Sequence, residues 1–181
     1  MFFKLNNFYK VILIIFTMIG YTMTAEANEN ILLLELKDGI VTIEMKPEVA
    51  PNHVARITEL VKEGFYDGLK FHRVIAGFMA QTGDPQGNGT GGSGKNLKAE
   101  FNNERHIKGT LSMARAQSPD SADSQFFICL DDAPHLNGQY TVWGQVIDGM
   151  EFVDNIKIGE GNNGSIIGEP DTIISIKIKS N

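Results

Sequence analysis

The most informative stretch of this sequence is FHRVIAGFMAQTGD, residues 71–84. Residues 71–82 form two short runs rich in apolar and β-branched side chains. Ala76-Gly77 lies between the runs, so the pattern predicts two strands joined by a turn. Glycines then crowd residues 83–94, a composition that cannot pack a core and predicts a surface loop. The stretch therefore predicts a small β-unit that leads into an exposed loop.

Further strands are predicted on both sides of this unit. Residues 31–36 and 40–45 are β-rich runs, and Asp38-Gly39 between them is a hairpin signal. The final stretch of the chain alternates apolar and polar side chains strictly, which is typical of a strand with one buried face. The later predicted strands span residues 110–114, 125–130, 141–147 and 173–179.

Two helices are also predicted. Residues 50–63 read as the longer one, because Pro51 suits a first helical turn and Gly64 suits the position just past a helix end. Its apolar residues Val54, Ile57, Leu60 and Val61 recur at helical spacing and predict a core-facing stripe. Residues 150–157 read as a second, shorter helix. About eight short strands with two helices favour a closed barrel or sandwich in one domain.

The first 27 residues have the composition of a secretory signal peptide. Lys4 and Lys10 are followed by an apolar run, residues 11–19, and then by the small-x-small sequence Ala25-Glu26-Ala27. The apolar run is far shorter than the roughly 20 residues that span a bilayer, so a membrane anchor is disfavoured. We therefore expect cleavage after Ala27 and a folded domain over residues 28–181, with no membrane span after cleavage.

Composition and charge exclude several classes of protein. The chain of 181 residues is 42% hydrophobic and 21% charged, which suits one globular domain and argues against disorder. Residues 28–181 keep 14 basic and 21 acidic side chains, a net charge of −7 that argues against nucleic acid as a partner. Cys129 is the only cysteine, so no internal disulfide can form, and its apolar neighbours predict a buried thiol.

Common catalytic motifs fail when they are tested in detail. Residues 89–96, GTGGSGKN, nearly match a phosphate-binding loop, but Asn96 stands where Ser or Thr must hold magnesium. The four histidines are not spaced as metal ligands, and no Gly-x-Ser-x-Gly elbow is present. The residues by themselves therefore predict no metal, no nucleotide and no hydrolytic triad.

The blocks FHRVI (71–75), GFMAQTGD (77–84) and SQFFI (124–128) together resemble the cyclophilin family, specifically its exported bacterial members. The blocks FYDG (65–68), LSMA (111–114) and VWG (142–144) extend the resemblance, which covers about residues 30–180. It implies an all-β fold, a closed eight-stranded antiparallel barrel capped by two α-helices. It also implies a peptidyl-prolyl cis-trans isomerase without a cofactor, whose active site lies on the outer face of the barrel.

The resemblance further implies a set of site residues. Arg73, Gln81 and Phe78 would be catalytic, and Arg73 would donate a hydrogen bond to the amide nitrogen of the twisted X-Pro bond. Because this rotation breaks no bond to hydrogen or carbon, the reaction needs no acid-base pair, nucleophile or metal. The implied substrate-binding residues are Met79, Ala114, Phe127, His135, Leu136 and Tyr140.

Two of these positions depart from the best-known eukaryotic pattern. His135 stands where that pattern has a tryptophan that contacts the inhibitor cyclosporin, and Tyr140 stands where it has a histidine. These departures put tight cyclosporin binding in doubt more than they do catalysis.

The expected function is isomerisation of X-Pro bonds during the folding of exported proteins, in the periplasm or, as the alternative, after secretion. The expected partners are unfolded or flexible proline-containing polypeptides, and the expected state is a monomer. An alternative from another class is a module that binds proline segments, or a chaperone, with little turnover. The presence of Arg73 favours the enzyme, because a module that only binds has no need of it.

Overall fold

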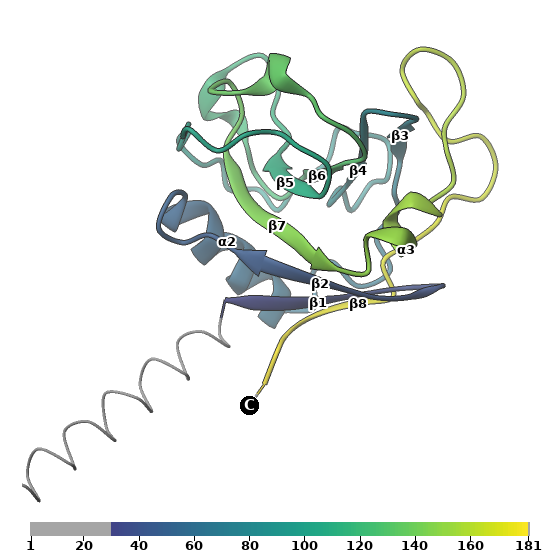
Figure 1. Cartoon of the computed structure of the whole chain (residues 1–181), viewed down its shortest axis with the longest axis horizontal. Helices are drawn as coiled ribbons and strands as arrows, with labels where there is room; N and C mark the ends of the chain where they lie inside the picture. The colour runs from purple at the N-terminus through teal and green to yellow at the C-terminus, as the bar shows by residue number, and fades with distance from the viewer. Residues whose placement is uncertain (1–29, 181) are drawn as a thin grey trace, which may run out of the picture.

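The computed structural model describes residues 30–180, so the predicted signal segment 1–27 lies outside the described residues. Eight strands form one sheet in the order β3-β4-β6-β5-β7-β2-β1-β8, and every neighbouring pair is antiparallel (Figure 1). The strands are β1 (Ile31–Leu36), β2 (Gly39–Met45), β3 (Arg73–Ile75), β4 (Met79–Thr82), β5 (Thr110–Met113), β6 (Phe126–Cys129), β7 (Val142–Asp148) and β8 (Ser175–Ile178).

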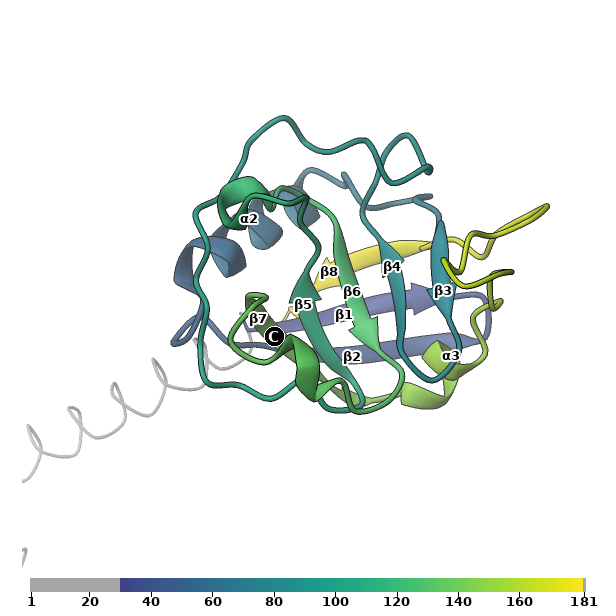
Figure 2. The ribbon, with the colours of Figure 1, turned by 90° about the horizontal axis from the view of Figure 1, so that it is seen from above.

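The two predicted helices are confirmed as α2 (Pro51–Lys62) and α3 (Met150–Asp154), which lie at opposite ends of the strands (Figure 2). Pro51 occupies the first turn of α2, and the predicted apolar stripe is buried together with His53. The helix α3 is shorter than the 150–157 predicted. Two 3-10 turns, Pro119–Ser121 and Pro134–Leu136, complete the regular structure of the described chain.

The hairpin between β1 and β2 differs from the prediction by one residue. Leu36 pairs with Gly39, so the turn is Lys37-Asp38 and Gly39 begins β2. The reason is tertiary: a Cβ at position 39 would meet the ring of Phe152 from α3 at 2.5 Å. Gly39 is therefore required for close packing of α3 against the hairpin, and not for the turn itself.

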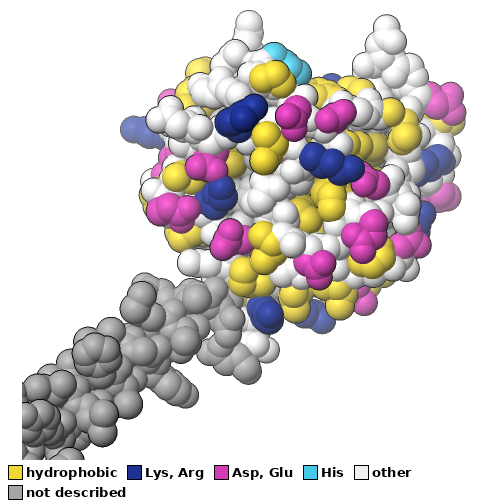
Figure 3. Space-filling view, viewed as in Figure 1, with side chains coloured by type: hydrophobic (Ala, Val, Ile, Leu, Met, Phe, Trp, Pro, Cys, Tyr) yellow, Lys and Arg dark blue, Asp and Glu magenta, His cyan; other side chains and the backbone are white. Residues whose placement is uncertain are grey.

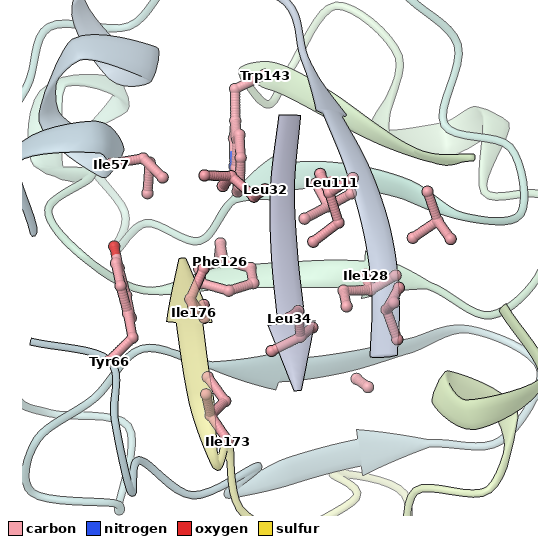
Figure 4. Close-up of a cluster of buried hydrophobic side chains, with 14 of the residues drawn as sticks. Leu32, Leu34, Ile57, Tyr66, Leu111, Phe126, Ile128, Trp143, Ile173 and Ile176 are labelled. Carbon is pink, nitrogen blue, oxygen red and sulfur yellow. The ribbon is translucent and has the colours of Figure 1, made fainter. Parts of the chain in front are cut away.

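The core lies on the concave side of the curled sheet (Figure 4). The Phe126 ring meets the Trp143 ring edge-to-face with centroids 5.4 Å apart, and meets the Tyr66 ring at 5.5 Å. Leu32 and Leu34 from β1 are almost fully buried beside them. Each such apolar side chain contributes roughly 1.5–3 kcal/mol on burial, so this inner face holds the sheet in its curl.

The predicted closure of the barrel is wrong, because the eight strands form an open half-barrel. The two edge strands, β3 and β8, do not pair with each other. On this side isolated bridges, Lys70 with Thr172 and Arg73 with Ser165, and separate backbone hydrogen bonds such as Val74 N–H to the Gly164 carbonyl take the place of a continuous strand ladder. The physical reason is that β3 has three residues and its outer edge meets the loop before β8. The loop therefore fills the position that a closing strand would take.

Candidate active site

The convex face of β3, β4 and β6 places the predicted site residues side by side. Arg73 on β3 pairs with Gln81 on β4, and Gln81 pairs with Phe127 on β6. The residues that alternate with them, such as Ala80 and Ile128, point into the core. Because neighbouring strand residues face opposite sides of a sheet, core packing on one side fixes the row Arg73–Gln81–Phe127 on the other.

A chain of side-chain hydrogen bonds runs along this row. Arg73 donates from Nη1 to Oε1 of Gln81 at 3.1 Å, and Gln81 donates from Nε2 to Oε1 of Gln125 at 2.9 Å. Gln125 in turn donates to the backbone carbonyl of Gly91 at 2.8 Å. An arginine only donates, so the direction of both amides follows from it. The acceptors are all neutral, and the positive charge of Arg73 is therefore not cancelled.

A pocket of about 170 Å³ with a mixed lining opens beside the Arg73 guanidinium, and its apolar part comes from the cluster of Met79, Phe127 and Leu136. Eight of the nine predicted residues line it; the ring of the ninth, His135, lies tilted against the Phe78 ring at its edge, with centroids 5.4 Å apart. The lining residues are Arg73, Phe78, Met79, Gln81, Ala114, Arg115, Phe127, Leu136 and Tyr140.

The Phe127 ring at the base of the pocket is held from two sides. Tyr140 meets it edge-to-face with centroids 6.0 Å apart, and the buried His106 ring stacks on it at 6.1 Å. Burial lowers the pKa of His106, so a neutral imidazole supports Phe127 at neutral pH. Such a ring is an apolar support for the pocket floor, and it contacts Asn137 and Ser112 on its polar edge.

Arg115 forms part of the pocket wall and holds Tyr140. Its guanidinium carbon lies 4.5 Å from the centroid of the Tyr140 ring, and Nη2 donates to the Gln139 carbonyl at 3.1 Å. A cation over an aromatic face is attracted by the ring quadrupole. Tyr140 is therefore held by a cation–π contact at the border of the pocket.

Cys129 lies beneath this pocket and is fully buried, as predicted. Burial is the main cause that raises the pKa of its thiol to about 12. The nucleophilic form of cysteine is the thiolate, so a thiol in this state packs as a small apolar side chain.

A second, more polar cavity of about 270 Å³ adjoins the first. The two share Gln81, Ala114 and Arg115, and the glycine-rich loop forms a wall of the second. Within this loop the Asp84 carboxylate accepts the N–H groups of three residues, and Asp123 likewise accepts the N–H groups of Ser93 and Gly94. The backbone amides of this loop thus bind carboxylates of the protein itself, whereas the amides of a phosphate-binding loop bind phosphate.

Three residues of this region were missed in the sequence. Gln125 precedes Phe127 by two positions, and strand alternation would have placed both on the same face. Arg115 follows Ala114 directly in the chain, but nothing in the sequence places its side chain over Tyr140. Asn163, whose backbone carbonyl accepts from Nε of Arg73 at 2.8 Å, carries no local signal because it lies 90 residues away.

Residues 30–180 contain no cluster of three or more His, Cys, Asp or Glu side chains arranged to hold a metal ion. In the same residues, no helix has the length and apolar character needed to cross a bilayer.

Comparison with known proteins agrees with this fold and assigns the family. The family model described as "Cyclophilin type peptidyl-prolyl cis-trans isomerase/CLD" matches residues 31–178. A Brucella suis protein named "Probable peptidyl-prolyl cis-trans isomerase" is 51% identical over 176 residues, 90% of each chain. Peptidyl-prolyl cis-trans isomerase B of Bacillus subtilis is 50% identical over 128 residues, which cover 69% of this chain and 89% of that protein.

Solved structures show the same architecture. The crystal structure of a Cryptosporidium parvum cyclophilin type peptidyl-prolyl cis-trans isomerase, determined in the presence of the dipeptide Ala-Pro, superposes with a TM-score of 0.76. It is 31% identical and covers 83% of this chain and 99% of its own. The chain therefore belongs to the cyclophilin-type peptidyl-prolyl cis-trans isomerase family. Its activity is the cis-trans isomerisation of peptidyl-prolyl bonds.

Proposed function

We propose that the Arg73 pocket is the active site, and that this isomerase acts in the periplasm on exported proteins that have yet to fold. The observation that carries the site assignment is the position of the Arg73 cation, held only by neutral acceptors, beside a pocket lined by the apolar side chains of Phe78, Met79 and Phe127. Substrates would be unfolded or flexible polypeptides that contain proline. The Cryptosporidium relative, whose structure was determined in the presence of Ala-Pro, supports this substrate class.

The rotation barrier of the peptide bond explains why the active site needs a charged hydrogen-bond donor. Partial double-bond character gives the peptide bond a rotation barrier of roughly 18–20 kcal/mol. Turnover of about a thousand per second needs a barrier near 13 kcal/mol, so the enzyme must supply about 6 kcal/mol. In the twisted transition state the amide nitrogen regains a lone pair. A donor aimed at that nitrogen binds only the twisted form and therefore lowers the barrier.

Arg73 is the donor for this role. A charge-assisted hydrogen bond contributes about 1.5–3 kcal/mol, a substantial part of the amount required. Gln81 holds the guanidinium from one side and would also hydrogen-bond the substrate backbone. The Ala114 N–H is already used, because it donates to the backbone carbonyl of Gln125 at 2.9 Å. The carbonyl of Ala114 would therefore be the group that aligns the residue before proline.

The remaining assistance would come from the pocket itself. Phe78, Met79, Phe127 and Leu136 would bury the proline ring, so that one end of the bond is held while the other end rotates. A less polar surrounding also favours a transition state whose carbonyl is less polarised. Tyr140 would close the pocket, and His135 at its edge would contact the substrate.

Exchange NMR with an Ala-Pro-Phe peptide tests this assignment. The wild-type protein should exchange the cis and trans signals rapidly, and Arg73→Ala should slow that exchange ten- to a thousandfold with an unchanged circular dichroism spectrum. Arg105→Ala is the matched control, because Arg105 is exposed and does not line the pocket. Equal rates for Arg73→Ala and wild type would remove Arg73 from the mechanism, and an unfolded variant would make it a structural residue.

The proposed compartment rests on residues 1–27, with their basic start, apolar run and Ala25-Glu26-Ala27 site. The net negative charge of the remaining chain supports a protein without nucleic acid as partner. Consistent with this, acidic and basic side chains are interspersed on the face shown in Figure 3. We expect a monomer.

Expression of the whole chain in a Gram-negative host, followed by fractionation and N-terminal sequencing, tests the compartment. The mature protein should start at Asn28 and should leave the cell with the osmotic-shock fraction. Ala27→Leu should block processing at this site. A full-length protein that stays in the cytoplasm would contradict export.

A further inference from the structure

The outer edge of β3 is covered by a segment from the far end of the chain. Residues 159–166, called here the 159–166 segment, lie between α3 and β8 (Figures 1 and 2). The Val74 N–H donates to the Gly164 carbonyl at 2.8 Å, and the Gly159 N–H donates to the Val74 carbonyl at 2.9 Å. Arg73 and Ser165 form a β-bridge. The segment is thus joined to the strand that carries Arg73 by its backbone.

The same segment also contacts the Arg73 side chain. The Asn163 carbonyl accepts a hydrogen bond from Nε at 2.8 Å, while Oε1 of Gln81 accepts from Nη1 at 3.1 Å. A guanidinium is planar, so two acceptors on different nitrogens fix both its position and its plane. Both acceptors are neutral, and Nη2 has no hydrogen-bond partner in the described part of the chain. The arrangement therefore orients the cation without occupying every donor.

The position of the Asn163 carbonyl depends on close packing at glycine. Gly164 has φ of +69°, a conformation that side chains other than glycine adopt rarely. A Cβ at position 164 would also overlap Cγ1 of Ile75 and lie 2.7 Å from the Val74 carbonyl oxygen. Any side chain at position 164 must therefore push the segment away from β3, and the acceptor for Nε moves with it.

We propose that the 159–166 segment is a positioning element of the active site, which orients the Arg73 guanidinium through the backbone carbonyl of Asn163. This inference rests on the proposed role of Arg73. The pocket lining contains no residue of this segment, so the segment acts on turnover through Arg73 and not through contact with the proline ring. An isomerase with a displaced segment binds its peptide normally but turns it over slowly.

Gly164→Ala tests the proposal, because a backbone carbonyl cannot itself be removed by substitution. The matched control is Gly168→Ala, just outside the segment. Gly168 has a similar φ of +76°, but a Cβ there meets only Nζ of Lys157, at 3.8 Å. Line-shape NMR of a peptide titration separates turnover from affinity. Gly164→Ala should lower the turnover rate about tenfold with less than a twofold change in Kd, and Gly168→Ala should stay within twofold for both.

A double-mutant cycle decides whether the effect passes through Arg73. In the Arg73→Ala background, Gly164→Ala should change turnover by less than twofold, because the group to be positioned is absent. A tenfold loss in both backgrounds would overturn the positioning role and leave the segment as a structural edge cover. Unchanged turnover in Gly164→Ala would overturn it as well. The Arg73→Ala variant alone tests the proposed function, so the two failures are distinguishable.

A measurement on the wild type keeps the proposal falsifiable if Gly164→Ala does not fold. In ¹⁵N spectra of arginine side chains, the Nε–H of Arg73 should exchange with water at least tenfold more slowly than that of the exposed Arg105. Equal exchange rates would show that Asn163 does not hold the guanidinium.

Discussion

Gln81 donates from Nε2 to Oε1 of Gln125 at 2.9 Å, while its own Oε1 accepts from Arg73 at 3.1 Å. Gln81 therefore lies between the cation and Gln125, which is anchored to the Gly91 carbonyl. The orientation of Arg73 thus depends on Gln81, and the orientation of Gln81 depends in turn on Gln125.

The first prediction concerns this chain of amides. Gln81→Ala removes the acceptor of Nη1 of Arg73 and should lower kcat/KM about tenfold, since a hydrogen bond to a charged group contributes roughly 1.5–3 kcal/mol. Gln125→Ala removes the bond from Gln81 and the bonds to the Gly89 and Gly91 carbonyls but keeps the acceptor of Arg73 Nη1, so it should cost less than Gln81→Ala. Exchange NMR of Ala-Pro-Phe measures both effects, and thermal unfolding checks the fold. A larger loss for Gln125→Ala, at unchanged stability, would contradict this order.

Arg115 should determine peptide affinity through Tyr140. Arg115→Ala removes the cation 4.5 Å from the Tyr140 ring centroid and the bond to the Gln139 carbonyl. Because exposed cation–π contacts contribute about 0.5–1 kcal/mol, we expect the peptide Kd to rise two- to fivefold with little change in turnover at saturation. Arg115→Lys should recover this affinity only in part, because an ammonium lacks the planar stack. An unchanged Kd in Arg115→Ala would show that Tyr140 holds its position unaided.

His135 should limit the affinity for cyclosporin. Its ring lies against Phe78 at the pocket edge, and His135→Trp would present a larger apolar surface at this place. We expect His135→Trp to tighten cyclosporin binding, measured by calorimetry, and His135→Ala to leave peptide turnover within threefold of wild type. If the tryptophan variant binds no better, the identity of residue 135 does not limit inhibitor affinity.

Glu100 should stabilise the fold at neutral pH and lose this effect in acid. Its carboxylate caps α2 by accepting the backbone N–H groups of Asn52 and His53, which lie 48 and 47 residues away in the chain, and by contacting His53 Nδ1 at 2.7 Å. Burial alone would raise the pKa of Glu100, but the hydrogen bonds from His53 and Asn52 outweigh it and lower the pKa below its ordinary value. Because the pKa of Glu100 is lowered in the folded state, its full contribution to the stability of the fold is present above the ordinary glutamate pKa of about 4.3. This contribution disappears as the pH falls through the lowered pKa.

Urea unfolding between pH 7 and pH 3 measures this contribution. Glu100→Gln should be less stable than wild type at pH 7, and the gap should narrow as the pH falls below about 4.3. Glu44→Gln, at an exposed glutamate on β2, is the control and should follow the wild type at every pH. A gap of constant size across this range would mean that the charge of Glu100 does not contribute to stability.

Local pattern in the sequence predicted most of the elements of the fold. The β-rich runs and their turn signals predicted all eight strands, and helical spacing of Val54, Ile57, Leu60 and Val61 predicted the buried face of α2. Such signals are local, because alternation and helical periodicity depend only on which face of an element is buried. The site residues were predicted from several sequence blocks that resemble the family and occur in the same order. No single residue would have been enough for this prediction.

Only the tertiary structure decided how distant segments meet. Closure of the barrel was wrong because the edge of a three-residue strand is covered by a loop, and no pattern within β3 or β8 encodes that encounter. The same applies to Asn163, which reaches Arg73 across 90 residues, and to Glu100, which caps α2. Sequence alone thus determined which side chains could do the chemistry. The curl of the sheet and close packing at glycine decided which backbone groups hold them in place.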